Sequence, residues 1–84
     1  MGNYGTDIQA AIATQIKAEM AAKNWKQPEL AKRAGLHTST LHRYLAGERD
    51  IPLPVFADIA DALGLTYVEL AGRAQRRLDG EDVL

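Results

Sequence analysis

The most constraining feature of the chain is the segment 26–49, which reads KQPELAKRAGLHTSTLHRYLAGER. Two short stretches with apolar residues at helical spacing flank Gly35, and the second stretch opens with small polar residues. A glycine tolerates the positive φ that a tight turn between two helices needs. We therefore expect two short helices packed at a steep angle, an arrangement that is used to place side chains in the major groove of DNA.

The 84 residues are enough for one domain with one modest core. We expect a single helix-turn-helix domain over 1–84, with its core at about 7–77 and a frayed tail at 78–84. The chain has no cysteine, which removes disulfides and thiolate chemistry and indicates an intracellular protein. No apolar stretch approaches the ~20 residues of a membrane span. The expected location is therefore the cytoplasm.

The charge of the chain is unevenly distributed. The net charge is −1, but residues 17–49 carry seven basic and three acidic side chains, a net charge of +4, whereas residues 50–84 carry three basic and seven acidic ones. The only basic part of the chain therefore coincides with the two short helices. This pattern is typical of a surface that faces DNA, surrounded by an acidic remainder.

The whole chain reads as helical, with no alternating strand pattern, which predicts an all-α fold of five helices. The first helix is expected to be capped by Thr6 or Asp7 and to end near 23–24. The second should have Pro28 in its first turn, and Trp25 before it is more easily explained as a packing residue than as a stacking platform. The first helix should bury an apolar series with a spacing of four, namely Ile8, Ile12, Ile16 and Met20.

The remaining helices are predicted from their caps. Residues 38–40 can cap a third helix that buries Leu41 and Leu45 and ends at Gly47. Prolines 52 and 54 should keep Ile51 and Leu53 extended, so the fourth helix is expected from about Pro54 to Gly64. Its predicted buried residues are Phe56, Ile59, Ala60 and Leu63. Thr66 and Glu69 form a capping box for a fifth helix that runs to about Arg77.

On these residues, the chain resembles the helix-turn-helix domain of lambda-repressor-like and Cro-like regulators, also called the xenobiotic-response-element family. The resemblance covers about residues 8–70. It rests on a glutamine that opens the second helix, a Leu-Ala pair, an Ala-Gly-apolar turn, a Ser/Thr-rich start of the third helix with a glycine at its end, and a fourth helix that ends in Ala-Leu-Gly-Leu. The resemblance implies a lambda-repressor-like fold and the function of a small repressor of phage or bacterial type. It also implies a location at the nucleoid of a bacterial or phage-infected cell. It also implies that Gln27 contacts the phosphate backbone and braces the third helix.

The third helix supplies the candidate base readers. Thr38 and Ser39 are short and can both donate and accept hydrogen bonds, as the edges of bases in the major groove require. Arg43, one turn further on, can bind O6 and N7 of guanine as a fork, and His42 is the fourth candidate. For contacts to phosphate we expect Gln27, together with Lys26, Thr40 and Arg49.

Each of these residues also has an ordinary structural explanation. Residues 38–40 would cap a helix in any protein, and Arg43 is as easily a solvated arginine or a phosphate contact. His37 and His42 are five residues apart, which is not the spacing of metal ligands on one helix face, so no metal site is expected. We expect no cofactor and no enzymatic activity, because no histidine, serine or third acid accompanies Asp58 and Asp61.

Two questions about partners stay open. Tyr67, Val68, Leu70 and Ala71 either complete the core or form a patch that is buried against a second copy. Because one module contacts only half of a DNA site, we expect a homodimer on an inverted-repeat operator in double-stranded DNA. One alternative is the antitoxin of a toxin–antitoxin pair, with Val83 and Leu84 of the acidic tail binding a protein partner. A second alternative is a module that binds only protein.

Overall fold

The computed structural model describes residues 2–81, and these form five α-helices and no strand. The helices are α1 (Tyr4–Ala22), α2 (Gln27–Ala34), α3 (Thr38–Leu45), α4 (Leu53–Ala62) and α5 (Tyr67–Leu78). The prediction of an all-α fold with five helices is confirmed. Within the described residues, no helix is long and apolar enough to cross a membrane.

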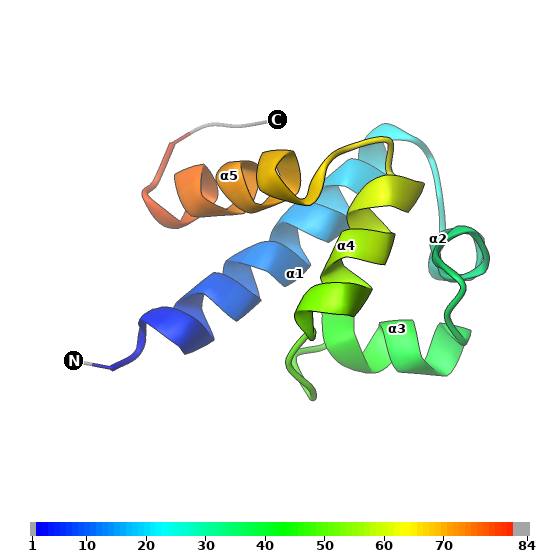
Figure 1. Ribbon diagram of the computed structural model, residues 1–84, viewed down its shortest axis with the longest axis horizontal. Coiled ribbons are helices and arrows are strands. Elements are labelled where there is room, and N and C mark those ends of the chain that lie inside the picture. The colour runs from blue at the N-terminus through cyan, green and yellow to red at the C-terminus, as the bar shows by residue number, and fades with distance from the viewer. Residues whose placement is uncertain (1, 82–84) are drawn as a thin grey trace.

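The longest helix, α1, runs along the molecule and contacts α3 and α5 (Figure 1). Helix α5 packs along α1, and α3 packs against α1 and α2. Helix α4 closes the structure because it packs against both α2 and α5. The short helices α2 and α3 therefore lie toward one end of the molecule, while α5 and the start of α1 lie toward the other (Figure 1).

Each helix contributes one large aliphatic side chain that is fully buried in the core. Ile16, Leu30, Leu41, Ile59 and Leu70 all have 0% of their surface exposed. Burying one such side chain completely is worth about 1.5–3 kcal/mol, so each helix is held in place by its own contribution to a shared cluster. All the residues predicted to be buried on the fourth helix are in this core. Of the series predicted to be buried on the first helix, Ile16 and Met20 are buried, whereas Ile8 and Ile12 are only half-buried.

All five helices end in the same way. The residue after the C-cap, or the C-cap itself, has a positive φ, and the next backbone N–H donates to a carbonyl five residues earlier. At the end of α2, Gly35 has φ 73° and the N–H of Leu36 donates to the carbonyl of Ala31 at 2.8 Å. The positive-φ residues at the five helix ends are Asn24, Gly35, Gly47, Gly64 and Gly80. The predicted helix-ending roles of Gly35, Gly47 and Gly64 are thereby confirmed.

The last of these helix ends corrects the expected frayed tail. Helix α5 includes Leu78, and the N–H of Glu81 donates to the carbonyl of Arg76 at 2.8 Å. Residues 78–81 are therefore part of a closed helix end, and the tail prediction is wrong for them. Residues 82–84 lie outside the described part of the chain.

The helix starts differ more from prediction. Helix α1 begins at Tyr4, so neither Thr6 nor Asp7 caps it, and Asn3 precedes it without a side-chain cap. Helix α4 begins at Leu53, so the prediction of an extended residue is wrong for Leu53, which is helical despite the proline that follows it. Ile51 lies outside the helix as predicted, and the N-cap residue Pro52 is extended. The capping box before α5 is confirmed, because Glu69 N–H donates to Thr66 Oγ1 at 3.0 Å and Thr66 N–H donates to Glu69 Oε1 at 2.7 Å.

A buried polar network that the sequence pattern did not predict joins α1 to α5. Gln15 and Glu19 are 0% and 5% exposed, although both are polar. Gln15 Nε2 donates to Glu19 Oε2 at 2.9 Å, Arg73 Nη1 donates to the same carboxylate oxygen at 2.6 Å, and Arg77 Nε donates to Gln15 Oε1 at 2.9 Å. Each buried polar side chain thus has a partner, as burial requires. The network fixes how α5 lies on α1.

Candidate nucleic-acid interface

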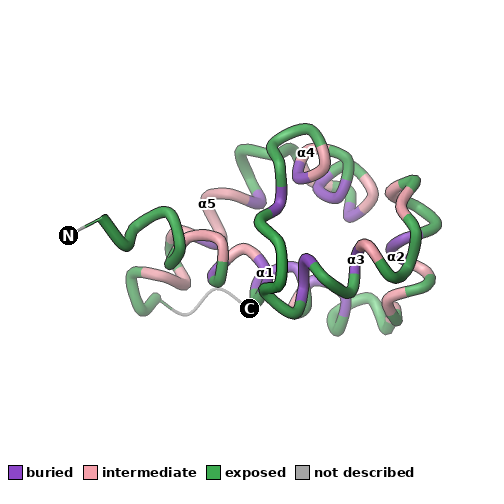
Figure 2. Tube along the Cα trace, turned by 90° about the horizontal axis from the view of Figure 1, so that it is seen from below, coloured by how far each residue is buried: buried purple, intermediate pink, exposed green. Residues whose placement is uncertain are grey.

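Helix α3 is held by one face and exposed on the other. Leu41, Tyr44 and Leu45 are buried against the rest of the molecule. The four candidate base readers, Thr38, Ser39, His42 and Arg43, are all exposed. Figure 2 views the molecule from the side on which α3 lies, and the exposed positions alternate there with buried ones along the helix. The structure therefore brings the predicted base readers onto one solvent-facing surface.

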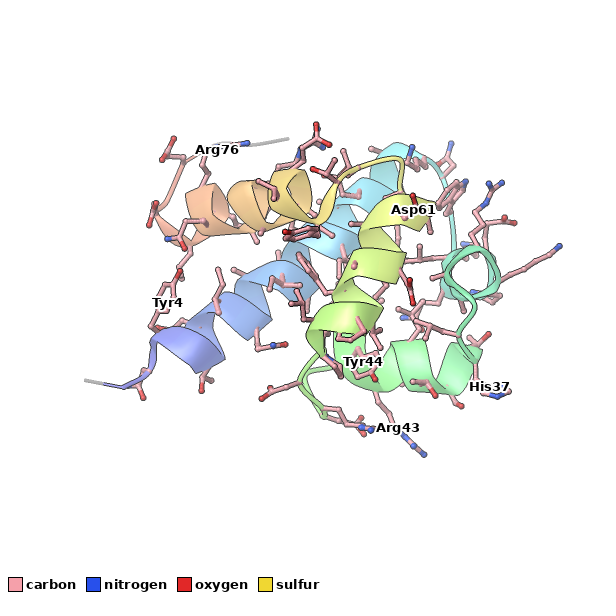
Figure 3. The ribbon with its side chains drawn as sticks, in the orientation of Figure 1. Tyr4, His37, Arg43, Tyr44, Asp61 and Arg76 are labelled. Carbon is pink, nitrogen blue, oxygen red and sulfur yellow. The ribbon has the colours of Figure 1, made fainter. Side chains whose placement is uncertain are left out.

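Arg43 is the long basic side chain of this surface. In Figure 3 its guanidinium extends away from the body of the molecule, below α3. The neighbouring Tyr44 points the other way and is only 5% exposed. Tyr44 was not predicted as a core residue, although it lies three residues after Leu41 on the same helix face.

The start of α3 corrects the predicted cap. His37 is the N-cap residue, with φ −71° and ψ 143°, and its side chain makes no capping hydrogen bond. The helix already includes Thr38, Ser39 and Thr40, so none of these three residues is at the N-cap position, and their hydroxyls do not act as the N-cap. The first backbone N–H groups of a helix have no partner within the helix and carry its partial positive charge. The positive end of α3 therefore coincides with the exposed Thr38 and Ser39.

A side-chain contact links α2 to α3 at this surface. Gln27, the first residue of α2, has its Oε1 3.3 Å from Nδ1 of His42. An amide oxygen accepts, so the ring nitrogen that faces it carries the proton and the other ring nitrogen is left as an acceptor in the neutral ring. Gln27 keeps its amide N–H₂ for a second partner. Gln27 is thus linked to α3 by its side chain, and its bracing and phosphate-contacting roles stay predictions.

The other expected phosphate contacts lie at the start of α2, on α3 itself and in the loop after α3. Lys26 is exposed and is the N-cap residue of α2. Thr40 is half-buried on α3. Arg49 is exposed in the loop after α3, and its guanidinium carbon lies 5.6 Å from the centre of the Tyr44 ring, within the range of a cation–π contact.

The loop that carries Arg49 is fixed by a glutamine that sequence reasoning missed. Gln9 Nε2 donates to the carbonyl of Ile51 at 3.2 Å, and the N–H of Ile51 donates to Gln9 Oε1 at 2.8 Å. The side chain of Gln9 therefore satisfies both backbone groups of one residue, as a neighbouring strand would. Ile51 itself is 5% exposed, so the loop is anchored to α1 by packing and by hydrogen bonds together.

With this geometry in place, comparison with known proteins identifies the family. The model of a family described as a helix-turn-helix domain matches residues 11–72. The chain belongs to this family. No curated protein and no solved structure matches the chain significantly.

The helix-turn-helix of this domain is α2, the Gly35 turn and α3, since these are the two short helices joined by a tight turn. In such motifs the second helix lies in the major groove and its N-terminal residues meet base edges. The family match supports DNA binding, and α3 is the helix that would carry it.

Part of the positive charge predicted for this surface is used elsewhere in the domain. Arg33 Nε lies 2.5 Å from Glu29 Oε2, and the Arg33 guanidinium is stacked 4.3 Å from the centre of the Trp25 ring. Lys23 Nζ lies over the same ring at 5.3 Å. Trp25 is half-buried against the core, in agreement with the packing role predicted for it. Arg43 on α3, Lys26 at the start of α2 and Arg49 in the loop after α3 are all exposed.

The residues predicted for a dimer interface divide into two groups. Leu70 is 0% exposed and belongs to the core, so its assignment to an interface is wrong. Its neighbours differ, since Tyr67 is 53% exposed, Val68 is 62% exposed and Ala71 is half-buried. These three remain predicted interface residues. Among the described residues, no group of three or more His, Cys, Asp or Glu side chains lies close enough to hold a metal ion.

Proposed function

We propose that this helix-turn-helix domain is a sequence-specific transcription regulator, a small repressor of bacterial or phage type that occupies an operator. Helix α3 would lie in the major groove of an inverted repeat, with one copy of the chain on each half-site. The observation that carries the proposal is the exposed face of α3, which combines short hydroxyl side chains, an outward arginine and the positive end of the helix in a chain of this family. The proposal assigns the chain no enzymatic activity.

Each proposed contact follows from the chemistry of its side chain. Thr38, Ser39 and Arg43 would meet base edges, with Arg43 suited to the two acceptors of guanine. Gln27 and Lys26, at the start of α2, would donate to phosphate oxygens and set the register of α3. Arg49 and Thr40 would add phosphate contacts on either side.

The test is the selection of bound sequences from a random pool of DNA duplexes at two salt concentrations. We expect an enriched inverted repeat, and Arg43→Ala should lose about 1–3 kcal/mol of discrimination at one position of each half-site. Arg76→Ala is the matched control, because Arg76 is an exposed arginine on α5, away from α3 (Figure 3). Binding without enrichment, or binding that salt abolishes equally for every sequence, would contradict the proposal.

The two alternatives make different predictions in the same experiment. A module that binds only protein would select no sequence, and Arg43→Ala would change nothing. The antitoxin alternative depends on Val83 and Leu84, which lie outside the described residues. It would be recognised by a second protein that co-purifies with the chain.

A further inference from the structure

The loop between α3 and α4, residues 46–52, lies beside the α3 surface and is anchored to the rest of the molecule at one residue. Helix α3 and this loop lie along the same edge of the molecule, at the bottom of Figure 1. Six of the seven loop residues are exposed, and the exception is Ile51, whose side chain belongs to the core. Arg49 lies two positions before this anchor. The backbone conformation at Ile51 therefore influences where the side chain of Arg49 can reach.

The middle of the loop takes its hydrogen bonds from Gln9 on α1. At the start of the loop, the N–H of Glu48 donates to the carbonyl of Arg43 at 2.9 Å, and at its end the carbonyl of Pro52 accepts from a backbone N–H of α4 at 2.9 Å. Between Glu48 and Pro52, the hydrogen bonds found among the described residues are the two that join Gln9 to Ile51, at 2.8 and 3.2 Å. An amide both donates and accepts, so one side chain occupies both backbone groups of Ile51 and fixes the orientation of its two peptide units.

The guanidinium of Arg49 lies against α3 and not against a carboxylate. It is near the ring of Tyr44, which is adjacent in the chain to the outward-pointing Arg43. Gln9, Tyr44 and Arg49 line one small hollow between α1 and the loop. Asp50 lines it as well, but within residues 2–81 neither of the two salt bridges involves Arg49. A guanidinium held beside α3 in this way can bind a phosphate oxygen with its N–H groups.

We infer that Gln9 is a positioning residue for DNA binding, because it holds the loop in the conformation from which Arg49 reaches a backbone phosphate. The inference rests on the proposed operator binding and adds a residue of α1 to it. Gln9 itself would touch no DNA. It would order the backbone around Ile51 before binding, so that the entropy lost in ordering the loop does not weaken the phosphate contact.

The first part of the experiment tests the hydrogen bonds in the free protein. Gln9→Met keeps the length of the side chain and removes both its donor and its acceptor. The amide proton of Ile51 should then exchange with solvent at least about tenfold faster than in wild type, because its acceptor is gone. Thr14→Ala, at an exposed polar residue of the same helix, is the matched control and should leave this exchange unchanged. Equal exchange in Gln9→Met and wild type would overturn the inference without any DNA.

The second part measures affinity for the selected operator at several salt concentrations. Arg49→Ala should weaken binding at least about tenfold, as expected for one hydrogen bond to a charged group. Gln9→Met should weaken it at least about threefold, and Thr14→Ala should match wild type. Each of the first two variants should also lower the salt slope, by up to about 0.9 for each half-site, because a phosphate contact is lost or weakened. The selected sequence should stay the same, since phosphate contacts do not read bases.

The double variant that combines Gln9→Met with Arg49→Ala shows whether the two residues act together. If Gln9 acts through Arg49, Gln9→Met should change the affinity by less than about twofold once the arginine is absent. A merely structural role of Gln9 would weaken binding equally with and without Arg49 and would leave the salt slope unchanged. That result would overturn the inference.

The inference and the proposed function fail in different ways. Independent losses from Gln9→Met and Arg49→Ala, in a protein that still selects an operator through Arg43, would contradict only the positioning role of Gln9. A wild-type chain that selects no duplex would contradict the proposed regulator, and with it the role of Gln9 in DNA binding, even if the Ile51 amide exchanges as expected.

Discussion

Gln27 at the first residue of α2 and His42 in the second turn of α3 are joined through their side chains, with 3.3 Å between Oε1 of the amide and Nδ1 of the ring. The two residues are 15 positions apart and belong to the two helices of the helix-turn-helix. A single amide can thus orient a ring on the α3 surface and still donate to a phosphate. The contact therefore couples the position of Gln27 on α2 to that of His42 on α3.

This pair predicts that Gln27→Ala and His42→Ala act non-additively on DNA binding. Each change should weaken binding to the selected operator, Gln27→Ala by about tenfold if it loses one hydrogen bond to a phosphate. The double variant should bind more weakly than wild type, but its loss of binding free energy should be smaller than the sum of the two single losses. The difference, which is the coupling energy, should be at least about 0.5 kcal/mol. Titrations of an operator duplex by fluorescence anisotropy measure all four proteins. Simple additivity would mean that the contact has no role in recognition.

The uncapped start of α3 predicts that His37→Ser stabilises the domain. His37 has the extended backbone of an N-cap residue, but its side chain makes no capping hydrogen bond. A serine there can accept from the backbone N–H two or three residues on, which should raise the free energy of unfolding by about 0.5–1 kcal/mol. Urea denaturation measures the change, and His37→Ala is the control that removes the ring without adding an acceptor. Equal stabilities of the serine and alanine variants would refute the capping argument.

The buried carboxylate of Glu19 predicts a large effect of Arg73→Ala. The Glu19 side chain is 7% exposed and its Oε2 lies 2.6 Å from Arg73 Nη1. Without the arginine, a buried negative charge would keep only the amide of Gln15 as partner, so the free energy of unfolding should fall by about 2–3 kcal/mol. Urea denaturation measures this change. Arg76→Ala is the control, because Arg76 is an exposed arginine of the same helix, and its free energy of unfolding should stay within about 0.5 kcal/mol of the wild-type value.

A second variant shows whether the loss comes from the charge. Glu19→Gln combined with Arg73→Ala removes both charges, so the double variant should be more stable than Arg73→Ala alone. If it is less stable, the network acts through packing of the arginine stem and not through the ion pair.

The capping box before α5 predicts a loss of stability in acid. The backbone N–H and the hydroxyl of Thr66 stabilise the charged carboxylate of Glu69 and lower its pKa below the ordinary 4.5. A group whose pKa is lower in the folded state stabilises the fold above its unfolded pKa and loses this effect as the pH falls through the folded pKa. The difference in stability between wild type and Glu69→Gln should therefore be present at neutral pH and shrink below about pH 4.5. Thermal unfolding from pH 7 to pH 3 tests this, and a constant difference would contradict it.

Much of this domain follows from local rules that act within a few residues. Gly35, Gly47 and Gly64 were predictable as helix ends because the left-handed conformation suits glycine wherever it occurs. The box of Thr66 and Glu69 was predictable because both partners lie within one turn. The exposed face of α3 follows from the spacing of Leu41 and Leu45, which leaves Thr38, Ser39, His42 and Arg43 outside.

The tertiary structure alone decided what depends on residues far apart in the chain. Gln15 and Glu19 are polar, so a hydrophobic pattern places them at the surface, and only the arginines of α5 make their burial tolerable. Leu70 and Val68 are both apolar residues of one helix, and only the packing of α5 on α1 separates the core residue from the exposed one. Local propensity determines where each helix ends, whereas the burial of a side chain is settled by the element that packs against it.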